Sequence, residues 1–468
     1  MNREVLRQTM RWLVLSAAIF CATTGAVQAR GNAEEIARLG RQLTCMGAEK
    51  SGTPGGVAEW TGKWLGAAPG MVTTPGVHPT DPYAHEKPLL TITAQNLATY
   101  ADHLGEGQKA MFRKYPKTFR MQVYPSHRDF RLDDAVCQAA AQNAAHAVLT
   151  TGGMGVTHGV MGAPPFPFPA SGLELVWNTL LTVRAAWDLR DTDVMVVYPN
   201  GTMMQGWQRL WGWSRVSDPR LRGKPYEGHS SVIMGIALLP EREKGTVKLI
   251  TDSFDYAGQP RQGWFYNPGT RRIRQLPGVG YDQAIESSGG TVMIDDARMF
   301  NGPPDRYQWS IVGKKEIFIP YNGFRLEGKA VGENRYARLL TVGHENPDFV
   351  RWELHRVWVL EGTLKEGYRH LYARRRLYVD EDSWLAVMAD NFDARGVLWR
   401  FGWVNNYYLP GPNIFNAGSA FYHDLDSGAY SAYDLAQAKP RSYLVNVPGA
   451  DYDKIEFYTT ENMKAIGY

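Results

Sequence analysis

The sequence predicts an α+β protein in which one large antiparallel sheet follows a segment of helices and loops. Hydrophobic residues make up 44% of the 468 residues and charged residues 21%, a balance typical of a water-soluble protein with an apolar core. Aromatic residues reach 12%, and 48 glycines and 27 prolines punctuate the chain, which argues against a bundle of helices. From about Asp191 onward, apolar residues recur mainly at every second position, which is the period of a strand.

The charge of the chain excludes one class of function. The formal net charge is only +4, from 51 basic and 47 acidic residues. Nucleic-acid-binding proteins carry a much stronger basic bias. We therefore expect no nucleic acid partner.

Residues 1–29 predict an export signal. Arg3, Arg7 and Arg11 make the start basic, and residues 12–27 carry no charge. The small residue Ala29 completes the pattern of a signal-peptidase site, so we expect cleavage after Ala29 and a soluble periplasmic chain that starts at Arg30. An uncleaved membrane anchor is the alternative, but the uncharged stretch is shorter than the roughly 20 apolar residues of a membrane span.

Two of the three cysteines remain in the mature chain. Cys21 lies in the signal, whereas Cys45 and Cys137 would reach an oxidising compartment, where disulfides persist. We expect a Cys45–Cys137 disulfide, and the alternative is a pair of buried free thiols.

Residues 30–165 predict a mostly helical and loop-rich N-terminal extension. Apolar spacing indicates a helix within 32–43, two short helices within 94–115 that are interrupted by Gly105 and Gly107, and an alanine-rich helix that begins at Asp133 or Asp134. The stretch 152–169 is rich in glycine and proline and marks a boundary. Its glycines miss the register of a dinucleotide-binding loop.

Residues 166–468 predict the sheet region. Ser171 and Glu174 form a capping box that begins a helix with an apolar stripe. Strand patterns follow, and Asp380-Glu381-Asp382-Ser383 is a polar turn between two of them, which predicts a hairpin. The expected strands include 194–198, 246–250, 263–266, 272–275 and 351–360.

Clusters of charged residues offer little evidence of a catalytic site or of an anion-binding site. Arg271, Arg272, Arg274 and the run 374–376 could meet lipid phosphates or an acidic partner, but solvated strand edges are the favoured interpretation. Asp295-Asp296 and residues 380–382 favour turns over paired acid–base catalysts. Neither a His-Glu-x-x-His nor a Gly-x-Ser-x-Gly motif occurs, so we expect no metal, no cofactor and no catalytic residue.

Several motifs in order along the chain resemble the domain-of-unknown-function 1329 family of exported proteobacterial proteins, which is commonly labelled outer-membrane lipoprotein-sorting-protein-like. The motifs that carry the resemblance span nearly the whole mature chain. They include Tyr83-Ala84-His85-Glu86-Lys87-Pro88, Tyr124-Pro125-Ser126-His127-Arg128, Tyr266-Asn267-Pro268-Gly269-Thr270-Arg271, Ile319-Pro320-Tyr321-Asn322, Glu353-Leu354-His355-Arg356-Val357-Trp358 and Tyr378-Val379-Asp380-Glu381-Asp382-Ser383-Trp384.

The resemblance implies a fold like that of the carriers LolA and LolB, in which an antiparallel sheet curls into an incomplete β-barrel with helices as a lid. Such a sheet encloses an apolar hollow for acyl chains. Alternating apolar residues on the expected strands are the candidate lining, although a filled sheet interior would show the same alternation. These residues are Trp264, Tyr266, Trp352, Leu354, Trp358, Leu377, Val379, Val397, Trp399 and Phe401.

The implied function is that of a periplasmic carrier for a hydrophobic ligand, such as a lipid or a lipoprotein acyl chain. The family association implies an inner-membrane transporter of the resistance–nodulation–division type and an outer-membrane protein as partners. Two alternatives stay open at this point. One is an envelope hydrolase with a site built from distant residues, and the other is an accessory transporter subunit that binds no ligand.

Overall fold

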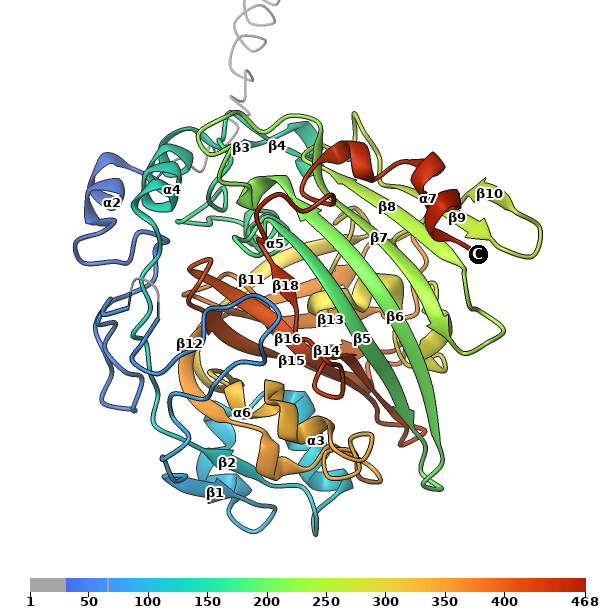
Figure 1. The fold of residues 1–468 in the computed structure, drawn as a ribbon. Helices are drawn as coiled ribbons and strands as arrows, with labels where there is room; N and C mark the ends of the chain where they lie inside the picture. The colour runs from blue at the N-terminus through green and yellow to red at the C-terminus, as the bar shows by residue number, and fades with distance from the viewer. Residues whose placement is uncertain (1–30, 65–66) are drawn as a thin grey trace, which may run out of the picture.

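One antiparallel sheet forms the frame of the protein and curls around a partly occupied interior (Figure 1). The computed structural model describes residues 31–64 and 67–468. The first meander of the sheet consists of β5 (Trp187–Val197), β6 (Met203–Ser214), β7 (His229–Leu239), β8 (Val247–Ser253), β9 (Gln262–Asn267) and β10 (Arg272–Gln275). The second consists of β11 (Tyr307–Pro320), β12 (Trp352–Leu364), β13 (Arg374–Asp380), β14 (Ala386–Phe392), β15 (Leu398–Leu409), β16 (Ile414–Asp424) and β17 (Tyr430–Leu435).

The two meanders join into a sheet that stays open. Strand β17 pairs antiparallel with β5, for example at Ala432 and Met195. In the described part of the chain, the end strands β10 and β11 do not pair with each other. This confirms the predicted α+β class with an incomplete antiparallel barrel. The short strand β18 (Leu444–Val445) adds to β5.

The predicted helices are present, with shorter bounds in places. Ser171 caps α5 (Gly172–Leu180), since its side chain accepts a hydrogen bond from the N–H of Glu174. The first expected helix ends early, at Arg38, because Leu39 takes an extended conformation. The helices of the N-terminal extension are α2 (Ala33–Arg38), the 3₁₀ helix η1 (Leu97–His103), α3 (Glu106–Lys114) and α4 (Asp134–His146).

The N-terminal extension is packed onto the sheet over its length. Its strands β1 (Leu90–Ile92) and β2 (Met121–Val123) pair with each other, and Val123 pairs with Trp352 at the start of β12. Met111 and Phe112 of α3 belong to one core cluster with Phe401 and Trp403 of β15. A small separate hairpin consists of β3 (Val148–Leu149) and β4 (Val156–Thr157).

Two elements occupy the interior of the curl. Helix α5 packs on β11 and β12, and its residues Leu175 and Val176 are fully buried. The connection between β10 and β11 carries the 3₁₀ helices η4 (Glu286–Ser288) and η5 (Ile294–Met299). Its residues Val292 and Met299 join the same core cluster as Leu175. The interior is therefore filled in part and hollow in part.

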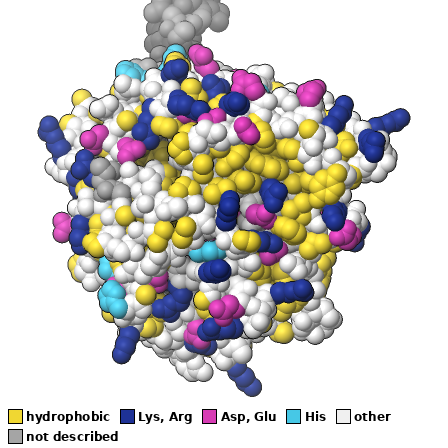
Figure 2. Space-filling model, viewed as in Figure 1, with side chains coloured by type: hydrophobic (Ala, Val, Ile, Leu, Met, Phe, Trp, Pro, Cys, Tyr) yellow, Lys and Arg dark blue, Asp and Glu magenta, His cyan; other side chains and the backbone are white. Residues whose placement is uncertain are grey.

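The C-terminal segment covers the other face of the first meander. Helix α7 (Thr460–Ile466) buries Met463 against Met234 of β7 and Leu249 of β8. Figure 2 shows hydrophobic side chains gathered over this region, in the upper right of the view where Figure 1 places β7, β8 and α7. The remaining short helices are α6 (Phe324–Glu327), η2 (Thr151–Gly153), η3 (Arg215–Ser217), η6 (Lys329–Gly332), η7 (Pro347–Phe349) and η8 (Ile455–Phe457). Within residues 31–64 and 67–468, no helix has the length and apolar character to cross a membrane.

Candidate ligand cavity

A cavity of about 300 Å³ lies between the inner face of β5–β8, strands β15 and β16, and residues 285–301. Its volume is at the lower end of the roughly 300–1,000 Å³ typical of small-molecule sites. Most of its wall is apolar. The apolar wall includes Leu210, Ile233, Ile250, Ile285, Val292, Ile294, Val404 and Ala420.

Strand alternation places the cavity on one face of the first meander. Ile233 of β7 and Ile250 of β8 pair across the two strands and both border the cavity. Their chain neighbours Val232 and Leu249 belong to the cluster beneath α7. Since successive side chains point to opposite faces of a strand, the cavity and the C-terminal segment lie on opposite sides of the same sheet.

Small residues on the inner face leave room for the hollow. Gly212, Gly235 and Ala237 border the cavity on β6 and β7. A Cβ atom added at Gly235 would lie 2.5 Å from Cδ2 of Leu210, so a larger residue there would meet the cavity wall. Glycine inside a strand is often a site where another group approaches closely. This pattern of small residues is the signal that the sequence offers for the cavity.

Most of the charged residues at the cavity are paired. Arg190 forms ion pairs of 2.9 Å with both Asp188 and Asp434. Asp252 receives two hydrogen bonds from Arg261, of 2.7 and 2.9 Å. Burial raises the pKa of Asp188. Arg184 and Arg298 also border the cavity, and within the described residues neither guanidinium has a hydrogen bond or ion pair.

None of the ten residues that the sequence analysis proposed as lining borders this cavity. Trp264 and Tyr266 lie on the opposite face of the first meander, in the cluster beneath α7. Trp352, Leu354 and Phe401 belong to the cluster formed with the N-terminal extension. Both faces of these strands are covered, so an apolar side chain at every second position does not identify the hollow face.

The other five proposed residues are dispersed as well. Leu377 and Val379 are fully buried in the cluster that includes α5, and Trp358 packs against that cluster. Val397 is 48% exposed, and Trp399 is half-buried with its Nε1–H donating to Asp424. The structure therefore distributes the ten residues over three core clusters, the exposed Val397 and the half-buried Trp399 of β15.

The arginine run 374–376 differs from the expectation that it lies at a solvated strand edge. Arg375 is fully buried, and its guanidinium pairs with Asp295 at 2.7 Å and with Asp296. His370 lies 2.9 Å from Asp295. The two aspartates, expected to be simple turn formers, hold the η5 segment on the sheet. Arg272 and Arg274, in contrast, are exposed on β10.

The cysteines expected to pair do so in the structure. Cys45 and Cys137 form a disulfide with Cα atoms 5.0 Å apart. It joins the loop after α2 to α4, and Cys45 packs against the cluster that includes α5.

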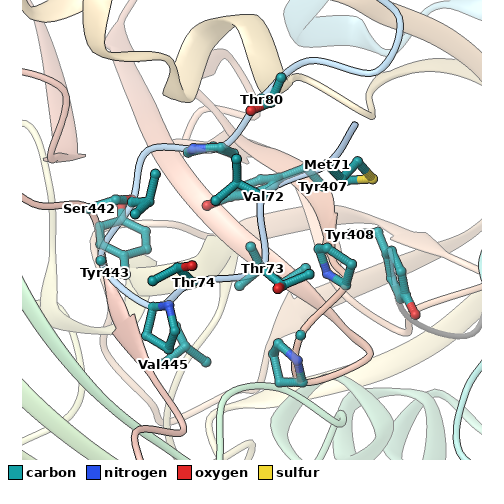
Figure 3. Close-up of a pocket in the computed structure, with 18 of the residues that line it drawn as sticks. Met71, Val72, Thr73, Thr74, Thr80, Tyr407, Tyr408, Ser442, Tyr443 and Val445 are labelled. Atoms are coloured by element: carbon teal, nitrogen blue, oxygen red, sulfur yellow. The ribbon is translucent and has the colours of Figure 1, made fainter. Parts of the chain in front are cut away.

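A second cavity of about 240 Å³ lies beneath the loop 71–80. Figure 3 shows Tyr407, Tyr408 and Tyr443 around it, with Thr73 and Thr74 of the loop. Much of its wall is loop, including four prolines, Pro75, Pro79, Pro410 and Pro412. The sheet contributes a smaller part of its wall, through Tyr407, Tyr408 and Leu409 of β15 and Val445 of β18.

One buried cluster has residue types that ligate metals. His355, Asp380 and Asp382 place ligand atoms within 4.8 Å of one another. Both oxygens of Asp382, however, accept hydrogen bonds of 2.7 Å from Arg128, and His355 Nε2 lies 3.0 Å from Glu353. These partners neutralise the cluster, and burial beside Asp382 raises the pKa of Asp380. The arrangement fits a structural ionic network between the N-terminal extension and the β13–β14 turn.

Comparison with known proteins places most of the chain in one family. The family described as "Protein of unknown function (DUF1329)" matches residues 91–464. The uncharacterized protein PA3922 of Pseudomonas aeruginosa is 37% identical over 434 residues, which cover 91% of this chain and 93% of that protein.

Two solved structures show weaker likeness. A DUF1329 family protein from Desulfovibrio piger is 12% identical, with a TM-score of 0.39, over 60% of this chain and 92% of that one. A LolA superfamily protein from Nitrosomonas europaea is also 12% identical, with a TM-score of 0.35, over 63% of this chain and 99% of that one.

Proposed function

The chain belongs to the DUF1329 family, described as proteins of unknown function, and we propose that it binds a hydrophobic ligand and carries it through the periplasm. The observation that supports this proposal is the cavity of about 300 Å³ inside the curl of the sheet. An interior that its own side chains do not fill is uncommon in proteins, where packing is close to that of organic crystals. A bound ligand would fill this space.

The driving force for binding follows from the wall of the cavity. Ile233, Ile250 and Val404 present apolar surface to the hollow. Removing apolar surface from water contributes about 25 cal/mol per Å². An acyl chain or another apolar body would gain this stabilisation by leaving water, and would lose it on transfer unless the acceptor were also apolar. The proposed mechanism is therefore burial followed by hand-over.

We propose that this activity takes place in the cell envelope. Residues 1–29 have the composition of a cleaved signal, and the Cys45–Cys137 disulfide suits an oxidising compartment. The partners we propose are those that the family resemblance implied, an inner-membrane transporter and an outer-membrane protein.

Analysis of co-purified molecules tests the proposal. The mature chain would be purified from the periplasm without detergent, extracted with organic solvent and compared by mass spectrometry with a control periplasmic protein. We expect a hydrophobic molecule in about equimolar amount. An empty extract, together with no uptake of a fluorescent fatty acid, would overturn the carrier proposal.

A matched pair of variants links the ligand to this cavity. Ala237→Trp places an indole at the cavity wall, whereas Val397→Trp adds the same group at a position that is 48% exposed. We expect Ala237→Trp to lose most of the co-purified molecule and Val397→Trp to retain it, with both variants folded by circular dichroism. Equal ligand content in the two variants would place the binding site elsewhere.

A further inference from the structure

Two cations at the cavity, Arg184 just before β5 and Arg298, have no side-chain partner within the described residues. The guanidinium of Arg298 is half-buried at the cavity wall and, in the described part of the chain, has no hydrogen bond or ion pair. Burial lowers its pKa, and the charge of Asp434 partly opposes this shift. Asp434 is already held by Arg190 at 2.9 Å.

The acidic residues closest to Arg298 in sequence form ion pairs with another arginine. Asp295 and Asp296 both pair with the buried Arg375 of β13. Asp296 also accepts a 2.8 Å hydrogen bond from the N–H of Met293, and its carbonyl oxygen accepts one of 3.2 Å from Tyr422. The turn is thus anchored ahead of Arg298 and has no carboxylate left for it.

The backbone of this turn directs successive side chains apart. Arg298 and Met299 both adopt left-handed conformations, with φ of 54° and 70°. Residues with side chains rarely adopt this conformation. Met299 is buried in the core cluster near Gly402, whereas Arg298 borders the hollow. A charged group thereby lies beside an apolar cavity.

We propose that Arg298 is the head-group site of this cavity, and that its ligand is a single-chain amphiphile with one anionic head, a carboxylate or a phosphate. An unpaired cation in an apolar wall is unfavourable unless an anion arrives with the ligand. A guanidinium binds either anion through two parallel hydrogen bonds. The small volume of the cavity favours one chain over several.

This inference rests on the proposed carrier function and adds the chemistry of the ligand. Its apolar chain would lie along Leu210, Ile233 and Ile250 of the sheet, and its head would reach Arg298 on the opposite wall. The ion pairs of Arg190 with Asp188 and Asp434 are self-contained, so they add no second anion site.

Three probes test the recognition of the ligand's head group separately from that of its alkyl chain. Wild type would be titrated with a pyrene-labelled long-chain fatty acid, with the alcohol of the same chain, and with the corresponding monoalkyl phosphate. We expect both anions to bind roughly 10- to 100-fold more tightly than the alcohol, the range of a charge-assisted hydrogen bond. The tighter of the two anions identifies the source of the head group.

Substitution of Arg298 should remove this preference alone. Arg298→Met should leave the affinity for the alcohol unchanged and reduce the advantage of the anions to less than about 3-fold, because only the charge pairing is lost. Arg298→Lys keeps the charge and should retain part of the advantage. The control Arg274→Met removes an exposed cation on β10 and should match wild type.

The outcomes separate the two proposals. If Arg298→Met keeps the full preference for the anions, or if wild type binds acid and alcohol equally, the head-group role of Arg298 is overturned and the carrier function stands. If wild type binds none of the three probes, the carrier function is overturned, and this role with it. Melting curves of the variants show whether each is folded.

Discussion

Arg128 binds both oxygens of Asp382, with Nε–Oδ2 and Nη2–Oδ1 distances of 2.7 Å. Each side chain is 1% exposed. Arg128 also donates to the carbonyl oxygens of Glu49 and Ala58, at 2.8 and 3.2 Å. A single guanidinium therefore joins two parts of the N-terminal extension to the turn between β13 and β14.

This pair predicts a large loss of stability on substitution. Arg128→Ala should lower the free energy of unfolding by roughly 3–5 kcal/mol, because it leaves Asp382 buried without its partner. The control is Arg120→Ala, which breaks the pair with Asp348, also at 2.7 Å but 38% and 54% exposed, and should cost about 1 kcal/mol or less. Urea denaturation measures both, and equal losses would contradict the role assigned to Arg128.

The disulfide predicts a second contribution to stability. The bond closes a loop across a sequence separation of 92 residues, so the chain-entropy account assigns it up to about 4–5 kcal/mol. Cys45→Ser and Cys137→Ser should each lower the midpoint of denaturation, and the double variant should lower it no further, since both remove the same bond. Alkylation of the denatured mature chain without reductant should leave its mass unchanged. Uptake of two labels would contradict the bond.

Glu327 predicts a dependence of stability on pH. Its carboxylate is buried and accepts hydrogen bonds from Asn405 and from the N–H of Ser419, both at 2.8 Å. Burial raises its pKa from 4.5 to about 7. The folded state therefore holds a proton that the unfolded state releases, and the resulting stabilisation is lost as the pH rises through about 7.

The magnitude and the control follow from this linkage. Between about pH 4.5 and 7, Glu327 should lower the free energy of unfolding by up to roughly 3 kcal/mol. Glu327→Gln should remove this slope, whereas Glu366→Gln, at an exposed glutamate, should keep it. Urea midpoints across this pH range measure the effect. An unchanged slope in Glu327→Gln would assign the pH dependence to other groups.

The export signal predicts a defined N-terminus. Residues 1–29 lie outside the described residues, so the expectation depends on composition. Expressed in a Gram-negative host, the full chain should give a periplasmic product whose N-terminal sequence begins at Arg30, because the small Ala29 precedes the cut. Recovery of a product in the membrane fraction that begins at Met1 would favour the uncleaved anchor.

Local features of the sequence predicted the local structure well. The hydroxyl of Ser171 and the spacing to Glu174 predicted the start of α5. Gly105 separates η1 from α3 as expected, whereas Gly107, also expected to interrupt the helices, lies within α3. The polar run 380–383 turns between β13 and β14. Each of these depends on neighbours a few residues apart, through a cap, a glycine or a turn residue, so a single segment carries the information.

The proposed lining residues show what such local information does not determine. Phe401 and Leu377 have the same apolar character, yet one packs beneath α3 and the other beneath α5, because this sheet is covered on both faces. Arg375 stands between two other arginines and looks like a solvated edge, but Asp295 and Asp296, about 80 residues earlier, receive it in the core. Apolar residues at every second position show that one face of a strand is buried, but they do not show which segment covers that face.

By itself, the sequence determined the α+β class, the helix starts, the hairpin and the pair of cysteines available for a disulfide. Only the tertiary structure decided where the hollow lies and which cations at its wall are unpaired, Arg184 and Arg298 in the described part of the chain. The cavity is bounded by segments far apart in the chain, which include β5–β8, residues 285–301 and strands β15–β17. The unfilled space, and the lack of a carboxylate partner for the guanidinium of Arg298, depend on all the segments that surround the cavity. A local sequence pattern holds no information about those distant segments.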